Sequence, residues 1–199
     1  MQINTHREFA MAEATTQPSE MSRPVDDGAA DHLVGEAMPA IRLPSTDGGD
    51  VDLGEPRAGW TVFFCYPRTG VPGIALPDGW EAIPGAVGCT PQACSFRDRY
   101  TDLLAAEATI FGVSTQTTEY QKEMAERLRL PYPVLSDAGL TLAKALRLPT
   151  FDAAGMTLLK RLTLIVCDSR IRHVFYPVFP PDENASQVLD WLQMHNQGR

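Results

Sequence analysis

One almost unbroken apolar run, WTVFFCY at residues 60–66, constrains the fold of this chain more than any other feature. Its aromatic and β-branched residues favour a strand, and a run without polar alternation is typical of a strand that is buried on both faces. Pro67 ends the run. Because such a strand needs a layer of structure on each side, the sequence predicts a sheet covered on both faces.

The segments around this strand alternate between strand and helix patterns. Two short apolar segments, 41–43 and 51–53, flank the turn sequence STDGGD and predict a hairpin. Thr118 and Gln121 form the expected capping box of one helix. Periodicity and turn residues predict further strands at 109–114, 161–167 and 172–179, and helices at 90–106, 118–130, 140–146 and 184–195. This order predicts an α/β fold.

Length and charge limit the class of protein. A chain of 199 residues is long enough for one domain with a real core. Residues 1–30 lack hydrophobic periodicity, so we expect a mobile tail there and a domain over 31–199. The net charge of −8 argues against nucleic acid or an anionic membrane as partner. Without a membrane-spanning run or a signal-peptide core, the sequence predicts a cytoplasmic protein.

Two of the four cysteines, Cys89 and Cys94, lie where the Gly- and Pro-rich loop meets the helix expected from residue 90. The dipole and unpaired amides of a helix N-terminus stabilise an anion, and the thiolate is the nucleophilic form of cysteine. Five residues of helix separate Cα atoms by roughly 8 Å, whereas a disulfide needs about 4.4 to 6.8 Å. If the two thiols react with each other, the first helical turn must unwind, which indicates a switch instead of a permanent crosslink.

Other interpretations of these cysteines stay open at this point. A free cysteine is often a small buried hydrophobe, and both could be of that kind. A metal site has little support, because two thiols at this spacing and four scattered histidines match no usual zinc pattern. Cys65 and Cys167 lie in expected buried strands, so we interpret them as structural.

The surrounding motifs resemble the peroxiredoxin family, in particular the bacterioferritin-comigratory-protein group of alkyl hydroperoxide reductase-like and thiol-specific antioxidant enzymes. The matching segments occur in family order: YP at 66–67, GCT at 88–90, QAC at 92–94, FRD at 96–98, FGVS at 111–114, LPYPVLSD at 130–137 and RLTLI at 161–165. The resemblance covers residues 34–193, nearly the whole expected domain. The resemblance implies a thioredoxin-like fold with a central mixed sheet and helices on both faces.

The resemblance also implies roles for single residues. Cys89 matches the peroxidatic cysteine, Cys94 the resolving cysteine, and Arg161 the arginine that neighbours the thiolate and helps to bind peroxide. Pro67 matches the proline that shields the cysteine. A guanidinium can stabilise a thiolate and donate to peroxide oxygens, although without the resemblance Arg161 and Lys160 form an ordinary basic pair at a strand end.

The sequence departs from the family pattern between Pro67 and Cys89. The family carries a threonine three residues before the cysteine, where this chain has Ala86, and Pro67 lies 22 residues before Cys89. Residues 68–87 are therefore an insertion, called the insertion below. Thr69 could fold back to supply the missing hydroxyl, or it could be a simple turn residue. The insertion itself could be a lid or a docking surface.

The resemblance implies a thiol-dependent peroxidase that acts on hydrogen peroxide or organic hydroperoxides through a Cys89 sulfenic acid and a redox-active Cys89–Cys94 disulfide. Thioredoxin or glutaredoxin is the expected reductant, no cofactor or metal is expected, and the protein would act as a monomer or homodimer. Two alternatives remain. The absent threonine favours a redox-sensing thiol protein that does not turn over, whereas a thioredoxin-type oxidoreductase lacks support because the chain has no C-x-x-C.

Overall fold

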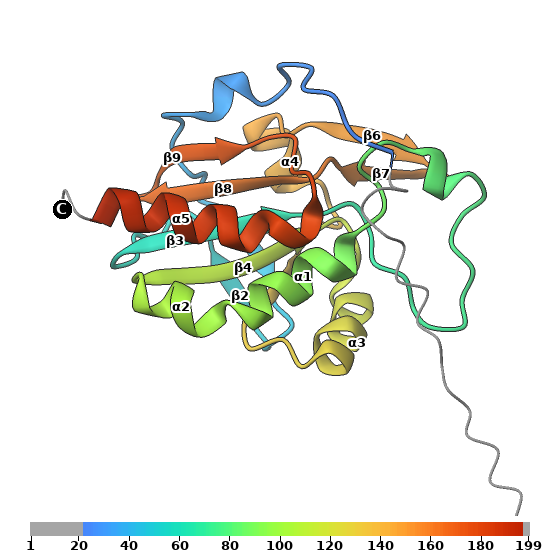
Figure 1. Cartoon of the computed structure of the whole chain (residues 1–199), viewed down its shortest axis with the longest axis horizontal. Coiled ribbons are helices and arrows are strands. Elements are labelled where there is room, and N and C mark those ends of the chain that lie inside the picture. The colour runs from blue at the N-terminus through green and yellow to red at the C-terminus, as the bar shows by residue number, and fades with distance from the viewer. Residues whose placement is uncertain (1–21, 197–199) are drawn as a thin grey trace, which may run out of the picture.

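The computed structural model describes residues 22–196, in which a central sheet carries helices on both faces (Figure 1). Within these residues, no helix has the length and apolar character needed to cross a bilayer. The elements, in chain order, are η2 (Asp31–Leu33), β1 (Arg42–Pro44), β2 (Asp50–Asp52), β3 (Trp60–Cys65), η3 (Trp80–Ala82), α1 (Cys89–Asp98), α2 (Tyr100–Ala105), β4 (Ala108–Ser114), α3 (Thr118–Leu128), β5 (Val134–Ser136), α4 (Thr141–Leu146), β6 (Thr150–Ala153), β7 (Met156–Leu159), β8 (Leu162–Cys167), β9 (Arg170–Phe175), η4 (Pro181–Glu183) and α5 (Asn184–Asn196).

The central sheet has five strands in the order β5-β4-β3-β8-β9. β3 pairs in parallel with β4, and β4 with β5, whereas β8 runs antiparallel to both β3 and β9. Helices connect the parallel strands, α1 and α2 between β3 and β4 and α3 between β4 and β5, because parallel neighbours need a crossover. The predicted mixed α/β sheet is confirmed, and so is the hairpin, formed by β1 and β2.

β3 lies at the centre of the sheet, and all six of its residues are buried. Successive side chains of a strand point to opposite faces. Phe64 therefore stacks on Phe96 of α1, with ring centroids 4.4 Å apart, in a cluster that also contains Leu192 of α5. Phe63 points to the other face and belongs to a cluster with Leu142 of α4. The prediction that this strand is buried on both faces is thus confirmed.

The helix expected over 90–106 is two helices. α1 ends at Asp98 and α2 begins at Tyr100, with Arg99 between them at φ −101° and ψ 7°, outside helical geometry. Leu103 of α2 is buried in the core, whereas its neighbour Leu104 is 50% exposed.

The predicted capping box at Thr118 and Gln121 is wrong. The residue before the helix is Thr117, and its side-chain oxygen accepts a hydrogen bond from the Tyr120 amide at 3.4 Å. Gln121 is buried, and its amide nitrogen donates to the Ser114 hydroxyl at 2.9 Å. The true cap lies one residue earlier than predicted, in a stretch of threonines that sequence reasoning could not rank.

A second hairpin, β6–β7, was not expected. Its antiparallel strands have four residues each and meet at Ala154 and Gly155, both with positive φ. An alanine at such a position is a weak turn signal, because side chains with a Cβ disfavour the left-handed region. This hairpin becomes important because the insertion packs against it.

The predicted tail over 1–30 lies for its first 21 residues outside the described part of the chain. Its remainder contacts the domain. The Asp27 carboxylate accepts hydrogen bonds from Lys160 Nζ at 2.6 Å and from the Tyr176 hydroxyl at 2.7 Å. These bonds hold the pKa of Asp27 well below its usual range. Part of the segment predicted as a tail is therefore bound to the domain through Asp27.

Candidate active site

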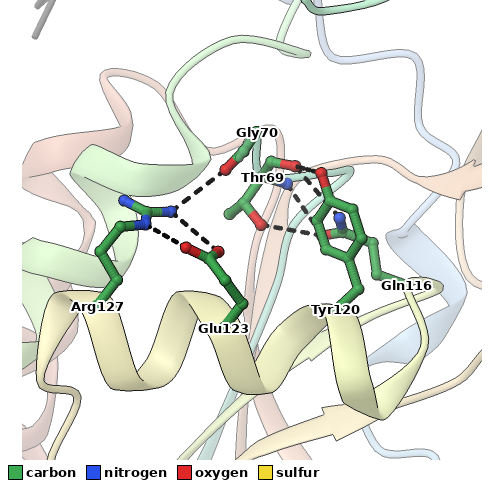
Figure 2. Close-up of polar contacts among 6 residues, drawn as sticks. All are labelled: Thr69, Gly70, Gln116, Tyr120, Glu123 and Arg127. Atoms are coloured by element: carbon green, nitrogen blue, oxygen red, sulfur yellow. Dashed lines mark hydrogen bonds and ion pairs between the residues drawn. The ribbon is translucent and has the colours of Figure 1, made fainter. Parts of the chain in front are cut away.

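The first residues of the insertion are bound to α3 and to Gln116 in the loop before it (Figure 2). Thr69 and Gln116 form a reciprocal pair: the Thr69 amide and hydroxyl donate to Gln116 Oε1 at 2.9 and 3.2 Å, and Gln116 Nε2 donates to the Thr69 carbonyl at 3.2 Å. The Tyr120 hydroxyl donates to the same carbonyl at 3.0 Å. Arg127 donates to the Gly70 carbonyl at 3.2 Å while pairing with a glutamate one turn earlier. One end of the insertion is thereby held in place.

The other end of the insertion packs against β6 and β7, as Figure 1 shows. Trp80 is 2% exposed and forms an apolar cluster with Ala86 and with Leu158 of β7. Its ring lies 6.3 Å from that of Phe151 of β6. The tryptophan is therefore packed against the domain and does not face solvent. The last residues of the insertion reach the start of α1 from this anchored position.

Cys89 is the first residue of α1. Gly88 before it has φ 102°, a left-handed conformation that glycine adopts without strain, and it turns the loop into the helix. The thiol is 4% exposed, and its sulfur lies 3.5 Å from the Ala86 carbonyl oxygen. The sulfur thus lies at the positive end of the helix dipole, as the sequence predicted, and it is shielded from water.

Arg161 directly precedes β8 and is 3% exposed. Because Leu162 pairs with Cys65 at the end of β3, the arginine lies beside the residues that lead from β3 into the insertion. Its Nη2 atom donates to the Cys89 sulfur at 3.2 Å. The same nitrogen contacts the carbonyl oxygens of Gly85 and Val87 at 3.1 and 3.0 Å. Arg161 therefore joins the thiol to the end of the insertion.

A buried hydrogen-bond network of polar side chains binds the other guanidinium nitrogen, Nη1. Arg161 Nη1 donates to Gln92 Oε1 at 2.5 Å, and Gln92 Nε2 donates to Asn184 Oδ1 at 2.9 Å. The Thr163 hydroxyl also donates to Asn184 Oδ1, at 2.7 Å. Gln92 and Asn184 are completely buried. The sequence analysis did not predict this network. Its one sequence signal was Gln92, a polar residue among apolar neighbours in the first turn of the helix.

The other cysteines differ in surroundings from Cys89. None of the four forms a disulfide. Cys94 is partly exposed and lies five residues further along α1. Cys65 and Cys167 are buried in β3 and β8, and burial, with a smaller contribution from the charge of Asp137, raises the pKa of the Cys65 thiol. That thiol is therefore held in its unreactive form.

The expected source of a hydroxyl at Cys89 is not found. Thr69 is buried, but its hydroxyl donates to Gln116. Ala86, at the position where the family has threonine, presents its carbonyl to the sulfur. Within residues 22–196, Cys89 is contacted by no side-chain hydroxyl. Pro67 is buried two residues after the end of β3. The structure thus places Pro67 at the expected loop start and Thr69 in a separate network.

This arrangement favours chemistry at sulfur. A buried thiol at a helix N-terminus, with a guanidinium donating to it, can act as a nucleophile toward a ligand that the same guanidinium polarises. Within the described residues, no three His, Cys, Asp or Glu side chains gather as a metal site would require.

Comparison with known proteins agrees with this thiol chemistry. The family model described as Redoxin matches residues 33–189. Peroxiredoxin Q, chloroplastic, from Suaeda salsa is 28% identical over 80% of this chain and 67% of its own length. Peroxiredoxin bcp1 from Schizosaccharomyces pombe is 32% identical over 65% of this chain and 60% of its own length. The match thus spans about two thirds or less of these relatives.

Solved structures show the same fold. Peroxidoxin BcpB from Mycobacterium tuberculosis is 28% identical, covers 81% of this chain and 97% of its own, and superposes with a TM-score of 0.65. A cysteine-to-serine mutant of PrxQ from Xylella fastidiosa, at 19% identity, covers 82% of this chain and 96% of its own with a TM-score of 0.67. The chain therefore belongs to the redoxin family, and within it to the peroxiredoxins, a class of thiol-dependent peroxidases. The predicted resemblance and the thioredoxin-like fold are confirmed.

Proposed function

We propose that this chain reduces peroxides with Cys89 as the attacking thiol and Cys94 as its resolving partner. The observation that carries the proposal is the hydrogen bond from Arg161 to the Cys89 sulfur at 3.2 Å. Within residues 22–196, Arg161 forms no ion pair with a carboxylate although it is buried. A buried cation needs a nearby anion, and a Cys89 thiolate supplies one.

The first step transfers oxygen to sulfur. The Cys89 thiolate attacks the terminal oxygen of the peroxide, and the O–O bond breaks. The sulfur becomes a sulfenic acid, and the second oxygen leaves with the bonding pair and is protonated to water or an alcohol. The Arg161 guanidinium stabilises negative charge on the sulfur and then on the departing oxygen. For Pro67, which is buried, we propose the role that the family resemblance implies, shielding the cysteine.

The second step joins the two cysteines. Cys94 attacks the sulfenic sulfur, an S–S bond forms, and water leaves. Since five residues of helix separate Cα atoms by roughly 8 Å, the first turn of α1 must open. That turn has no side-chain cap at Gly88, and its opening breaks the backbone bond from the Gln92 amide to the Gly88 carbonyl at 3.0 Å together with the Gln92 side-chain bonds to Arg161 and Asn184. A dithiol reductant then restores both thiols by exchange.

The cycle also defines expected partners. We propose thioredoxin or glutaredoxin as the reductant, and therefore a reducing compartment such as the cytoplasm as the place of action. All residues of the proposed cycle come from one chain, so a monomer or each subunit of a homodimer can complete it. The net charge of −8 argues against nucleic acid or an anionic membrane as a partner, and the proposed thiol cycle requires no cofactor.

The test is peroxide-dependent NADPH oxidation coupled through thioredoxin and its reductase. We expect Cys89→Ser to abolish turnover and Cys94→Ser to abolish or strongly reduce the thioredoxin-dependent rate. Cys167→Ser, a buried strand cysteine outside the site, is the matched control and should retain the rate. Turnover that persists in Cys89→Ser would contradict the proposal.

A redox-sensing role is the second candidate, because Ala86 leaves Cys89 without the hydroxyl contact of the family. This role predicts a Cys89 sulfenic acid that dimedone traps readily, combined with no turnover when thioredoxin and glutaredoxin are each supplied. Rapid turnover with either reductant would eliminate it.

A further inference from the structure

Arg68, the first residue of the insertion, is a partly buried cation that contacts a methionine sulfur. Its Nη1 atom donates to the Met156 sulfur at 3.2 Å, and its Nη2 atom donates to the Tyr120 hydroxyl at 3.3 Å. Within residues 22–196, Arg68 pairs with no carboxylate, and its buried Nε atom has no hydrogen-bond partner. Because a thioether sulfur is only a weak acceptor, the guanidinium lacks a strong acceptor at Nη1.

Met156 begins β7 at the edge of the apolar cluster that contains Trp80. The residue is partly exposed, so a molecule as small as hydrogen peroxide can approach its sulfur. Two other methionines are enclosed in the core, since Met38 is 5% and Met124 0% exposed. Met156 therefore differs from them in two respects, its access to solvent and its contact with a cation.

Peroxide oxidises a thioether to a sulfoxide. A sulfur lone pair attacks one oxygen of hydrogen peroxide, an S–O bond forms, and the O–O bond breaks. The second oxygen departs with the bonding pair as hydroxide, takes the proton of the transferred oxygen and becomes water. The sulfur loses two electrons and the peroxide gains them, so the reaction needs no further oxidant or reductant.

The product of this reaction suits Arg68 better than the thioether does. A sulfoxide oxygen carries more negative charge than a thioether sulfur, and hydrogen bonds from a charged donor to oxygen are about twice as strong as neutral ones. The three rotatable bonds of methionine let the side chain turn the new oxygen toward Nη1. A sulfoxide in apolar surroundings normally disrupts packing, whereas here a donor already lies beside the sulfur.

We propose that Met156 is a site of oxidation by hydrogen peroxide and that Arg68 binds the oxygen of the resulting sulfoxide. The new hydrogen bond joins the first residue of the insertion to β7, the strand against which Trp80 already packs through Leu158. Oxidation therefore fixes the insertion more firmly to the domain. The inference goes beyond the proposed peroxidase and does not depend on it, because peroxide itself oxidises the thioether without Cys89.

The modification is tested by treating Cys89→Ser with hydrogen peroxide and following each methionine by peptide mass spectrometry. The serine variant is used so that the proposed attacking thiol does not consume the oxidant. We expect one added oxygen on Met156 well before Met38 and Met124, which are enclosed. Absence of oxygen on Met156, or its addition only together with the two enclosed methionines, would overturn the proposal.

The thermal midpoint tests the role of Arg68. Oxidation should raise the Tm of Cys89→Ser by about 2 to 4 °C, the shift that one added hydrogen bond produces in a domain of this size. It should lower the Tm of Cys89→Ser/Arg68→Leu, in which the sulfoxide oxygen has lost its donor. Cys89→Ser/Met156→Leu measures the separate effect of oxidising Met194, which is 66% exposed, and this effect is subtracted.

A matched control removes a different arginine. Arg42 is exposed in β1, and Cys89→Ser/Arg42→Leu should show the same rise in Tm on oxidation as Cys89→Ser. A shift of the same sign with and without Arg68 would overturn the binding of the sulfoxide by this guanidinium. Hydrogen exchange gives a second readout, because amides of the insertion should exchange more slowly after oxidation only when Arg68 is present. Equal or faster exchange in the oxidised protein would also overturn the proposal.

Discussion

Removing the Arg161 guanidinium is the sharpest test of the site. Arg161→Met keeps a flexible apolar stem of similar length but deletes every donor. The Cys89 sulfur loses its hydrogen bond at 3.2 Å, Gln92 loses its partner at 2.5 Å, and the carbonyls of Gly85 and Val87 lose theirs. One substitution therefore removes the positive charge at the sulfur and loosens the end of the insertion.

The expected loss of rate follows from the lost charge stabilisation. Deleting one preorganised donor to developing negative charge typically slows catalysis about 100- to 1,000-fold. We expect that loss in the second-order rate constant of Cys89 with hydrogen peroxide, measured by stopped-flow tryptophan fluorescence under single-turnover conditions. The free energy of unfolding should also fall by about 1 to 3 kcal/mol, because buried acceptors lose their donor. Urea denaturation checks this second effect.

Two further variants separate charge from folding. Arg161→Lys keeps the charge but loses the planar fork, so its rate should lie between those of wild type and Arg161→Met. Arg170→Met removes an exposed arginine of β9 and should leave the rate unchanged. A rate for folded Arg161→Met within about twofold of wild type would refute the role given to the guanidinium, since a lost donor should cost far more.

Three other predictions concern the parts that hold the site. Gln92→Leu should lower the free energy of unfolding by about 1 to 3 kcal/mol in urea denaturation, because it leaves Arg161 and Asn184 without a buried hydrogen-bond partner. An unchanged free energy of unfolding would contradict a structural role for this hydrogen-bond network. Trp80→Ala removes a buried side chain, a change that typically costs about 3 to 5 kcal/mol, and should raise hydrogen exchange in the insertion more than in the sheet; equal protection there would show that the tryptophan is no anchor. Asp27 has a lowered pKa when folded, so its contribution is present above about pH 4 and is lost as the pH falls. The Tm difference between wild type and Asp27→Asn should therefore narrow on acidification, and a constant difference would refute the ion pair.

Local patterns were enough to predict the core. The run at 60–66 was predicted correctly as the central strand, because a strand that is buried on both faces needs apolar side chains at successive positions. The break between the strands expected at 161–167 and 172–179 was equally readable, and in the structure Asp168 and Ser169 adopt positive φ between β8 and β9. Cys89 was placed correctly at the start of a helix because the Gly- and Pro-rich loop and the helical pattern after it are both local signals.

Contacts between distant segments could not be predicted in this way. Thr69 was a candidate because it is the threonine of the insertion and the loop could fold back, but Gln116, remote in sequence, binds it. Gln92 looked like an ordinary polar residue of a helix, because its partners Arg161 and Asn184 lie far along the chain. Hydrogen-bond partners depend on the completed fold, and a single sequence carries little trace of them.

Contacts with distant segments also explain how a long insertion is compatible with a site in which the atoms must be precisely placed. The insertion spans 20 residues, but loop-closure entropy grows only slowly with length, and both ends are fixed by contacts. Near the end, the Ala86 side chain is completely buried and belongs to the cluster with Trp80 and Leu158, whereas its carbonyl oxygen lies 3.5 Å from the Cys89 sulfur. The backbone that faces the thiol is thus positioned by packing on the opposite side of the loop. A hydroxyl at this position would have to displace either that packing or the Arg161 contact, which accounts for the alanine.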